Sequence, residues 1–163
     1  MKLNLFIMLF LSLVICSGIY AQEKSPKKYD AVTNFDPSRN PAQDVKDAVV
    51  EAERSNRRII LDVGGNWCIW CHRIDNFIDE NKDLSGLLHK NFVVVKVNYS
   101  PENKNEQFLS QYPKIQGYPH FFVLDENGEL IHSQDTGKLE KGKGYDKGKF
   151  ISFIKKWAPE KVK

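Results

Sequence analysis

The chain has 163 residues, with 24 lysines and arginines against 21 aspartates and glutamates, so its formal net charge is +3. This length predicts a single domain with a real hydrophobic core, which we place at residues 41–163. The small positive charge gives no indication of a nucleic-acid partner.

Residues 1–21 have the pattern of a secretory signal peptide. Lys2 supplies the positive start, the run from Leu3 to Ile15 is mostly apolar but too short to span a bilayer, and Ala21 is the predicted last residue before cleavage. We therefore expect a periplasmic or secreted protein. Cys16 follows Ile15, which is bulky where a lipoprotein signal has a small residue, so the sequence favours cleavage over lipidation.

The next segments predict a lead-in, a helix and a strand. Residues 22–40 have no periodicity and are expected to lie at the surface. Asn40 and Pro41 are typical of a helix start, and apolar residues follow at helical spacing: Ala42, Val45, Val49 and Ala52. Residues 58–63 are apolar enough for a buried strand.

A second helix, a second strand and a third helix follow. Gly64, Gly65 and Asn66 end the first strand, and a helical pattern begins near Cys68. A short helical piece follows Asp83. Residues 92–97 predict a central strand. A helix is then expected to open at residues 100–101 with one apolar face: Phe108, Leu109 and Tyr112.

The last third of the chain predicts a hairpin and a final helix. Residues 120–124 form a strand, Asn127 and Gly128 a turn, and residues 130–131 the returning strand. Residues 137–148 are rich in glycine and lysine and are expected to be a solvated loop. A helix over 150–157 ends the domain. We expect an α/β fold in which a mixed central sheet, with parallel strands and a closing antiparallel hairpin, is flanked by about four helices.

Cleavage of the signal removes Cys16 and leaves two cysteines, Cys68 and Cys71. Two cysteines separated by two residues at the start of a helix suit redox chemistry. Free backbone N–H groups and the helix dipole stabilise a thiolate on the first sulfur, and the second is close enough to close a disulfide. The pair can then exchange two electrons with a partner by disulfide exchange.

Three other interpretations of the pair remain at this point. Cys68, Cys71 and His72 also form the signature of c-type haem attachment, with His72 as an iron ligand. A purely structural disulfide would close a very small loop and add little stability. A zinc site would need a second pair of ligands, which the sequence does not provide, so we expect no metal.

Several separated features resemble the thioredoxin superfamily. Trp67 and the cysteine pair follow a strand and open a helix, and Asp62 stands six residues before Cys68, where the family has a buried acid. Lys96 matches a lysine near that acid, and Tyr118-Pro119 matches the family's cis-proline. The chain is most similar to exported thioredoxin-like proteins, including the C-terminal thioredoxin-like domain of the periplasmic membrane thiol reductase. The resemblance implies a thioredoxin-like fold.

The resemblance also implies roles for particular residues. Cys68 is expected to be the exposed attacking thiolate and Cys71 the resolving thiol. Asp62, if buried, would have a raised pKa and take the Cys71 proton, and Lys96 would tune Asp62. The residues expected to bind substrate are Trp67, Ile69, Trp70, Tyr118 and Pro119.

The sequence departs from thioredoxin between and after the cysteines. Ile69 and Trp70 stand where thioredoxin has glycine and proline, and His72 replaces a lysine. Strong oxidants of the superfamily tend to have a histidine between the cysteines, and this chain has none there.

We therefore expect an exported thiol–disulfide oxidoreductase, with reduction favoured and no cofactor beyond the Cys68–Cys71 disulfide. Its partners would be cysteine-containing exported proteins and a membrane or periplasmic thiol–disulfide electron donor, and it would act as a monomer. The alternatives are a non-catalytic adaptor module with a structural disulfide and a c-type haem protein.

Overall fold

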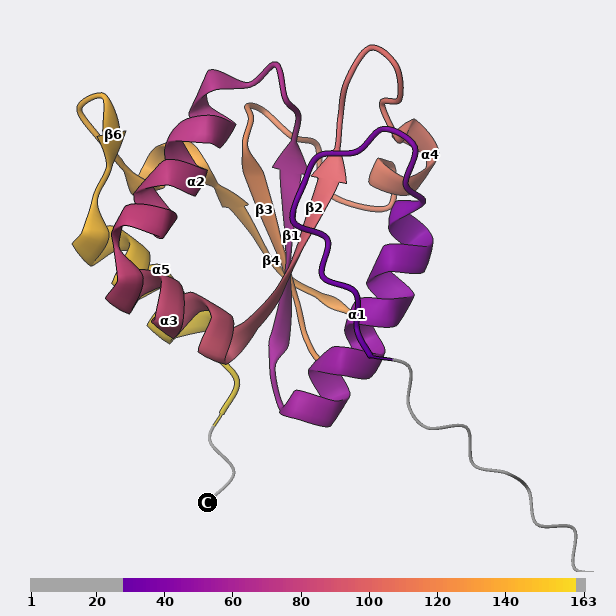
Figure 1. The fold of residues 1–163 in the computed structure, drawn as a ribbon, viewed down its shortest axis with the longest axis horizontal. Helices are drawn as coiled ribbons and strands as arrows, with labels where there is room; N and C mark the ends of the chain where they lie inside the picture. The colour runs from indigo at the N-terminus through magenta and orange to yellow at the C-terminus, as the bar shows by residue number, and fades with distance from the viewer. Residues whose placement is uncertain (1–27, 161–163) are drawn as a thin grey trace, which may run out of the picture.

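The computed structural model describes residues 28–160, which form a mixed sheet with helices on both faces (Figure 1). The strands are β1 (Arg58–Gly64), β2 (Phe92–Asn98), β3 (His120–Leu124) and β4 (Leu130–Asp135), in the order β2-β1-β3-β4. β1 pairs in parallel with β2, and β3 pairs antiparallel with β1 and β4. This confirms the predicted fold class. The predicted signal peptide lies outside the described residues.

The helices divide between the two faces of the sheet. Figure 1 shows α1 (Pro41–Ser55) on one face, and α2 (Ile69–Glu80), α3 (Lys82–Asn91) and α5 (Lys147–Trp157) on the other. The Asn40 side chain accepts the backbone N–H groups of Ala42 and Gln43, which caps α1 as the sequence predicts. With the short α4 (Glu106–Leu109), the described residues contain five α-helices, where about four were expected.

The sheet separates two hydrophobic clusters because alternate strand residues point to opposite faces. Ile60, Phe121 and Val123 pack toward α2, α3 and α5, while Leu61, Phe122 and their neighbours pack toward α1. β1 is therefore buried on both faces, and its carboxyl end delivers the chain to the cysteine pair. Within residues 28–160, no helix is both long and apolar enough to cross a bilayer.

The prediction that residues 92–97 form a central strand is wrong, because β2 is the edge of the four-stranded sheet. Its apolar sequence has a different cause. The lead-in segment covers the outer side of β2, where the carbonyl of Val32 accepts the backbone N–H of Lys96 at 3.2 Å. Val32 is itself buried in the cluster that faces α1. An edge strand covered in this way is as apolar as a central one.

The prediction of a helix that opens at residues 100–101 is also wrong, since α4 covers only Glu106–Leu109. Side chains hold this stretch as a loop instead. The Asn98 amide donates to the carbonyl of Asn103 at 2.8 Å, and the Asn105 amide donates to the carbonyl of Asn98 at 2.7 Å. Asparagine side chains that satisfy backbone groups in this way compete with helix formation.

Residues 137–148 are not the solvated loop that their composition predicts. They contain most of the 3-10 helix η1 (Thr136–Leu139), a hairpin of β5 (Glu140–Lys141) and β6 (Gly144–Tyr145), and the start of α5. Two residues hold this segment against the domain: Leu139 and Tyr145 are buried in the hydrophobic cluster formed with α2, α3 and α5.

Candidate functional site

Cys68 and Cys71 form a disulfide at the beginning of α2, with their Cα atoms 5.2 Å apart. Cys68 is the N-cap residue of this helix, and its sulfur accepts the backbone N–H of Cys71 at 3.1 Å. Cys68 is 4% exposed and Cys71 is 0% exposed. Cys68 is therefore the more accessible residue of the pair, but the prediction that it is exposed is wrong, because Phe35, Trp70 and Tyr118 pack around the two cysteines.

The glycine that ends β1 allows the disulfide to approach the strand. A Cβ atom at Gly64 would lie 2.5 Å from the sulfur of Cys71 and 3.1 Å from the Phe35 ring. Phe35 belongs to the lead-in, and its carbonyl accepts the Asn66 amide at 3.1 Å. Phe35 thus covers the disulfide on the side of the lead-in. Sequence reasoning missed it because one aromatic residue in an aperiodic segment gives no signal.

Replacing Gly64 with alanine is expected to lower the free energy of unfolding of the oxidised protein by about 1–3 kcal/mol, since the added methyl group overlaps the Cys71 sulfur. The measurement is urea unfolding followed by tryptophan fluorescence. Gly86→Ala is the matched control, because nothing lies within 4 Å of its Cβ position in α3 and alanine favours a helix by up to about 1 kcal/mol. Equal destabilisation by both substitutions would contradict the close approach.

Aromatic side chains form a second feature of the site. The Trp67 indole donates to the carbonyl of Tyr99 at 2.7 Å and meets the Tyr118 ring edge-on at 5.6 Å. Tyr118 also stacks on Tyr99 at 4.8 Å, and its peptide bond to Pro119 is cis. Trp67 and Ile69 are 55% and 60% exposed. Exposed apolar residues next to a reactive group are typical of a binding surface for partners.

Trp70 takes a different position from these exposed residues. It is half-buried, its ring meets Tyr145 edge-on at 5.8 Å, and the Arg73 guanidinium lies 4.4 Å from its centroid. Trp70 therefore packs between the disulfide cluster and the β5–β6 hairpin. His72 is exposed, and its Nε2 atom lies 2.8 Å from the carbonyl oxygen of Asn66.

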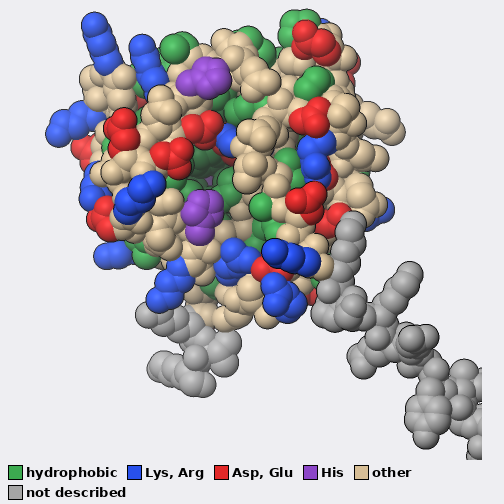
Figure 2. Space-filling model, in the orientation of Figure 1, with side chains coloured by type: hydrophobic (Ala, Val, Ile, Leu, Met, Phe, Trp, Pro, Cys, Tyr) green, Lys and Arg blue, Asp and Glu red, His purple; other side chains and the backbone are tan. Residues whose placement is uncertain are grey.

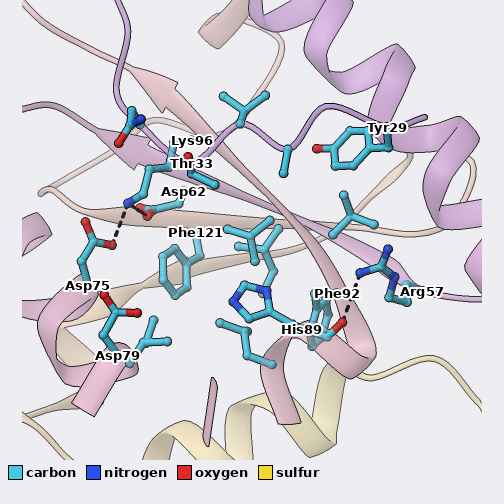
Figure 3. Close-up of a pocket in the computed structure, with 18 residues that line it drawn as sticks. Tyr29, Thr33, Arg57, Asp62, Asp75, Asp79, His89, Phe92, Lys96 and Phe121 are labelled. Carbon is cyan, nitrogen blue, oxygen red and sulfur yellow. Dashed lines mark hydrogen bonds and ion pairs between the residues drawn. The ribbon is translucent and has the colours of Figure 1, made fainter. Parts of the chain in front are cut away.

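An ion network connects β1, β2 and α2. The Lys96 ammonium donates to Asp62 at 3.0 Å and to Asp75 at 2.7 Å, so it bridges two carboxylates (Figure 3). Asp62 is 3% exposed, and its Oδ1 atom has no hydrogen-bond partner. The sequence predicted Asp62 and Lys96 as a pair but missed Asp75. Its position four residues after Cys71, on the same helix face, could have indicated it.

Burial decides the direction of the pKa shift for Asp62 but not for Lys96. Loss of hydration raises the pKa of Asp62 above its ordinary value, and the attraction of Lys96 offsets this only in part. Burial alone would lower the pKa of Lys96, but the charges and hydrogen bonds of Asp62 and Asp75 outweigh it and raise that pKa. The lysine therefore stays charged, while Asp62 keeps its proton to a higher pH than an ordinary aspartate does.

A cavity of about 550 Å³ opens beside Asp62. Figure 3 shows Asp75 and Asp79 at one side of it, His89 and Arg57 at the other, and the Phe121 ring between them. Figure 2 shows this face of the molecule hollowed near its centre. The cavity is large enough to hold water molecules, and the residues that line it include the charged side chains of Asp62, Asp75 and Lys96.

Comparisons with known proteins agree with this geometry. Residues 45–143 match the family model of the Thioredoxin-like domain. A solved structure described as a disulphide isomerase from Xylella fastidiosa Temecula1 is 25% identical, has a TM-score of 0.64, and is matched over 75% of this chain and 94% of its own. The oxidised DsbD C-terminal domain of Neisseria meningitidis, 17% identical with a TM-score of 0.54, shares the fold over 72% of this chain and 96% of that one.

A curated relative gives a shorter match. Spermatogenesis-associated protein 20 of Rattus norvegicus is 36% identical over 52 residues, which are 32% of this chain and 7% of that protein. The chain therefore corresponds to only a small part of the curated relatives that it matches.

Proposed function

Since this chain belongs to the thioredoxin-like family, we propose that it is an exported thiol–disulfide oxidoreductase that exchanges its Cys68–Cys71 disulfide with cysteines of partner proteins. The observation that carries the proposal is the position of this disulfide at the N-terminus of α2, with Cys68 as the more accessible residue of the pair. The resemblance to a disulphide isomerase of known structure supports the same chemistry without fixing its direction.

In the reducing direction, the Cys68 thiolate attacks a partner disulfide. A mixed disulfide forms, and the partner's other sulfur leaves as a thiolate. Cys71 then gives its proton to Asp62 and attacks the Cys68 sulfur. The Cys68–Cys71 disulfide forms again as the partner's second sulfur leaves as a thiolate. The partner has gained two electrons, and its two thiolates are protonated by the proton that Cys71 released and by one proton from solvent.

The surroundings of the pair support this sequence of steps. The helix N-terminus favours negative charge on Cys68, and Cys71 is shielded from competing attack. Burial raises the pKa of Asp62, which brings it closer to the pKa of a thiol and favours proton transfer between the two groups. Trp67, Ile69 and Tyr118 offer a partner an apolar surface beside the disulfide, and the backbone around Pro119 would pair with an extended substrate.

We propose reduction as the physiological direction, with a membrane or periplasmic thiol–disulfide protein as electron donor. A buried acid such as Asp62 is typical of reducing relatives. The proposal also includes export through the signal peptide at residues 1–21 and action as a monomer.

The reduction potential of the Cys68–Cys71 couple tests the proposal. We expect a two-electron transition near about −270 mV in a dithiothreitol titration. Tryptophan fluorescence can follow it, because Trp67 precedes Cys68 and Trp70 lies between the two cysteines. A value near about −120 mV would instead indicate an oxidant. The absence of any transition would contradict redox activity and favour the adaptor, or the haem protein if a Soret band is present.

A further inference from the structure

Residues 138–149, which we name the basic hairpin, concentrate positive charge. They contain five lysines and two acidic residues, so their net charge equals the +3 of the whole chain. The remaining residues are therefore neutral in sum. Figure 2 shows basic side chains projecting from the edge of the molecule where Figure 1 places β6. Such an asymmetry produces a directed electrostatic field rather than a uniformly charged surface.

Four of the five lysines are exposed, although the Lys149 ammonium donates to the carbonyl of Glu140 at 2.7 Å. The four are Lys138, Lys141, Lys143 and Lys149. Lys141 lies 3.8 Å from Asp146 while its side chain remains 77% exposed, so that ion pair is weak. Lys147 has the closest acidic partner, Asp83, at 2.7 Å.

A buried residue of the basic hairpin, Tyr145, contacts the disulfide site. The Tyr145 ring meets Trp70 edge-on, and its hydroxyl donates to the Trp70 carbonyl at 3.4 Å. Just before the hairpin, the buried Thr136 hydroxyl donates to the carbonyl of Pro119. Arg73, over the Trp70 ring, extends the positive surface toward the cysteines. The charge is thus held in a fixed position beside the redox site.

We infer that the basic hairpin is a docking surface for partner proteins that carry an acidic segment near their exchanging cysteines. The inference rests on the proposed function and names its substrate class. A positive surface beside the disulfide attracts acidic partners during diffusion and orients them, which raises the association rate more than the final affinity. A protein partner is favoured over an anionic membrane because the surface adjoins the sulfurs that must meet the partner's cysteines.

The test compares two disulfide peptides that differ only in flanking aspartates or serines. For the unmodified protein at low salt, we expect kcat/KM to be at least about tenfold higher for the aspartate peptide, and the ratio to approach one at 0.5 M salt or so. The double variant Lys141→Glu with Lys143→Glu should bring the low-salt ratio to one or below. Its reduction potential should not move.

The matched control is Lys46→Glu with Lys90→Glu, which changes the net charge equally. Lys46 lies on α1, and Lys90 lies at the end of α3 just before β2 begins, at the opposite end of the sheet from the disulfide. This variant should keep the ratio of the unmodified protein. If the ratio of the two kcat/KM values falls to one in both variants, only net charge matters and the inference is overturned.

Two further outcomes separate the possible failures. Equal turnover of both peptides by the unmodified protein would overturn the docking surface but leave the proposed function intact. No turnover of either peptide would contradict the proposed function and the inference together. If phosphatidylglycerol vesicles bind the unmodified protein but not the Lys141→Glu, Lys143→Glu variant, while the peptide ratio is one in both, the surface serves a membrane and the inference is overturned.

Discussion

A Cys68→Ser variant is expected to reduce no disulfide substrate above the uncatalysed background. Cys68 is expected to be the attacking residue because it caps the N-terminus of α2 and is 4% exposed, while Cys71 is 0% exposed. A serine hydroxyl is too weak a nucleophile and too poor a leaving group to take part in disulfide exchange. The measurement is insulin reduction, or reduction of a fluorescent peptide disulfide, with dithiothreitol as the electron donor.

Cys71→Ser is the matched variant and should behave differently. It keeps the attacking sulfur but cannot resolve the mixed disulfide, so it should remain covalently attached to a partner and appear at higher mass on a non-reducing gel. Both variants should fold, because the disulfide closes too small a loop to contribute much stability. Normal turnover by the folded Cys68→Ser variant would rule out the proposed mechanism.

An Asp62→Asn variant is expected to be more stable than the unmodified protein at neutral and alkaline pH, and slower in catalysis. Burial raises the pKa of Asp62 in the folded chain above its ordinary value of 3.8. The folded protein therefore holds a proton that the unfolded chain releases, so its stability falls as pH rises from the ordinary pKa through the raised one. At a pH above both pKa values, each pKa unit by which the folded value exceeds the unfolded one lowers the free energy of unfolding by about 1.4 kcal/mol.

Asparagine removes this dependence because it does not ionise, and Lys96 keeps its partner Asp75 at 2.7 Å. Urea unfolding of both proteins between pH 4 and pH 9 or so should therefore show curves that diverge as pH rises. Disulfide reduction should slow by about 10²-fold, the lower end for loss of a proton acceptor. Asp75→Asn is the control: Asp75 is half-exposed, so its removal should leave most of the pH dependence in place. Parallel curves for Asp62→Asn and the unmodified protein would contradict a raised pKa.

The local structure around the cysteines could be predicted from the residues of that stretch alone. The glycine pair, the cysteine spacing and the helical periodicity after Cys68 each act over a few residues, so β1, the turn and α2 could be predicted within one or two positions. The same holds for α1, whose Asn40 cap and Pro41 start depend on neighbouring backbone groups alone. Asp62 and Lys96 came from the resemblance, and the structure places them in one ion pair.

Other features depend on contacts between distant segments and could not be predicted from the sequence. The lead-in covers β2 and brings Phe35 against the disulfide, which no local pattern indicates. Leu139 and Tyr145 turn a lysine-rich stretch into an anchored hairpin beside Trp70, because burying two apolar side chains outweighs a composition typical of loops. Asp75 joins the buried pair only once α2 packs on the sheet. Composition and periodicity describe one segment at a time, whereas these contacts form between segments that the folded chain brings together.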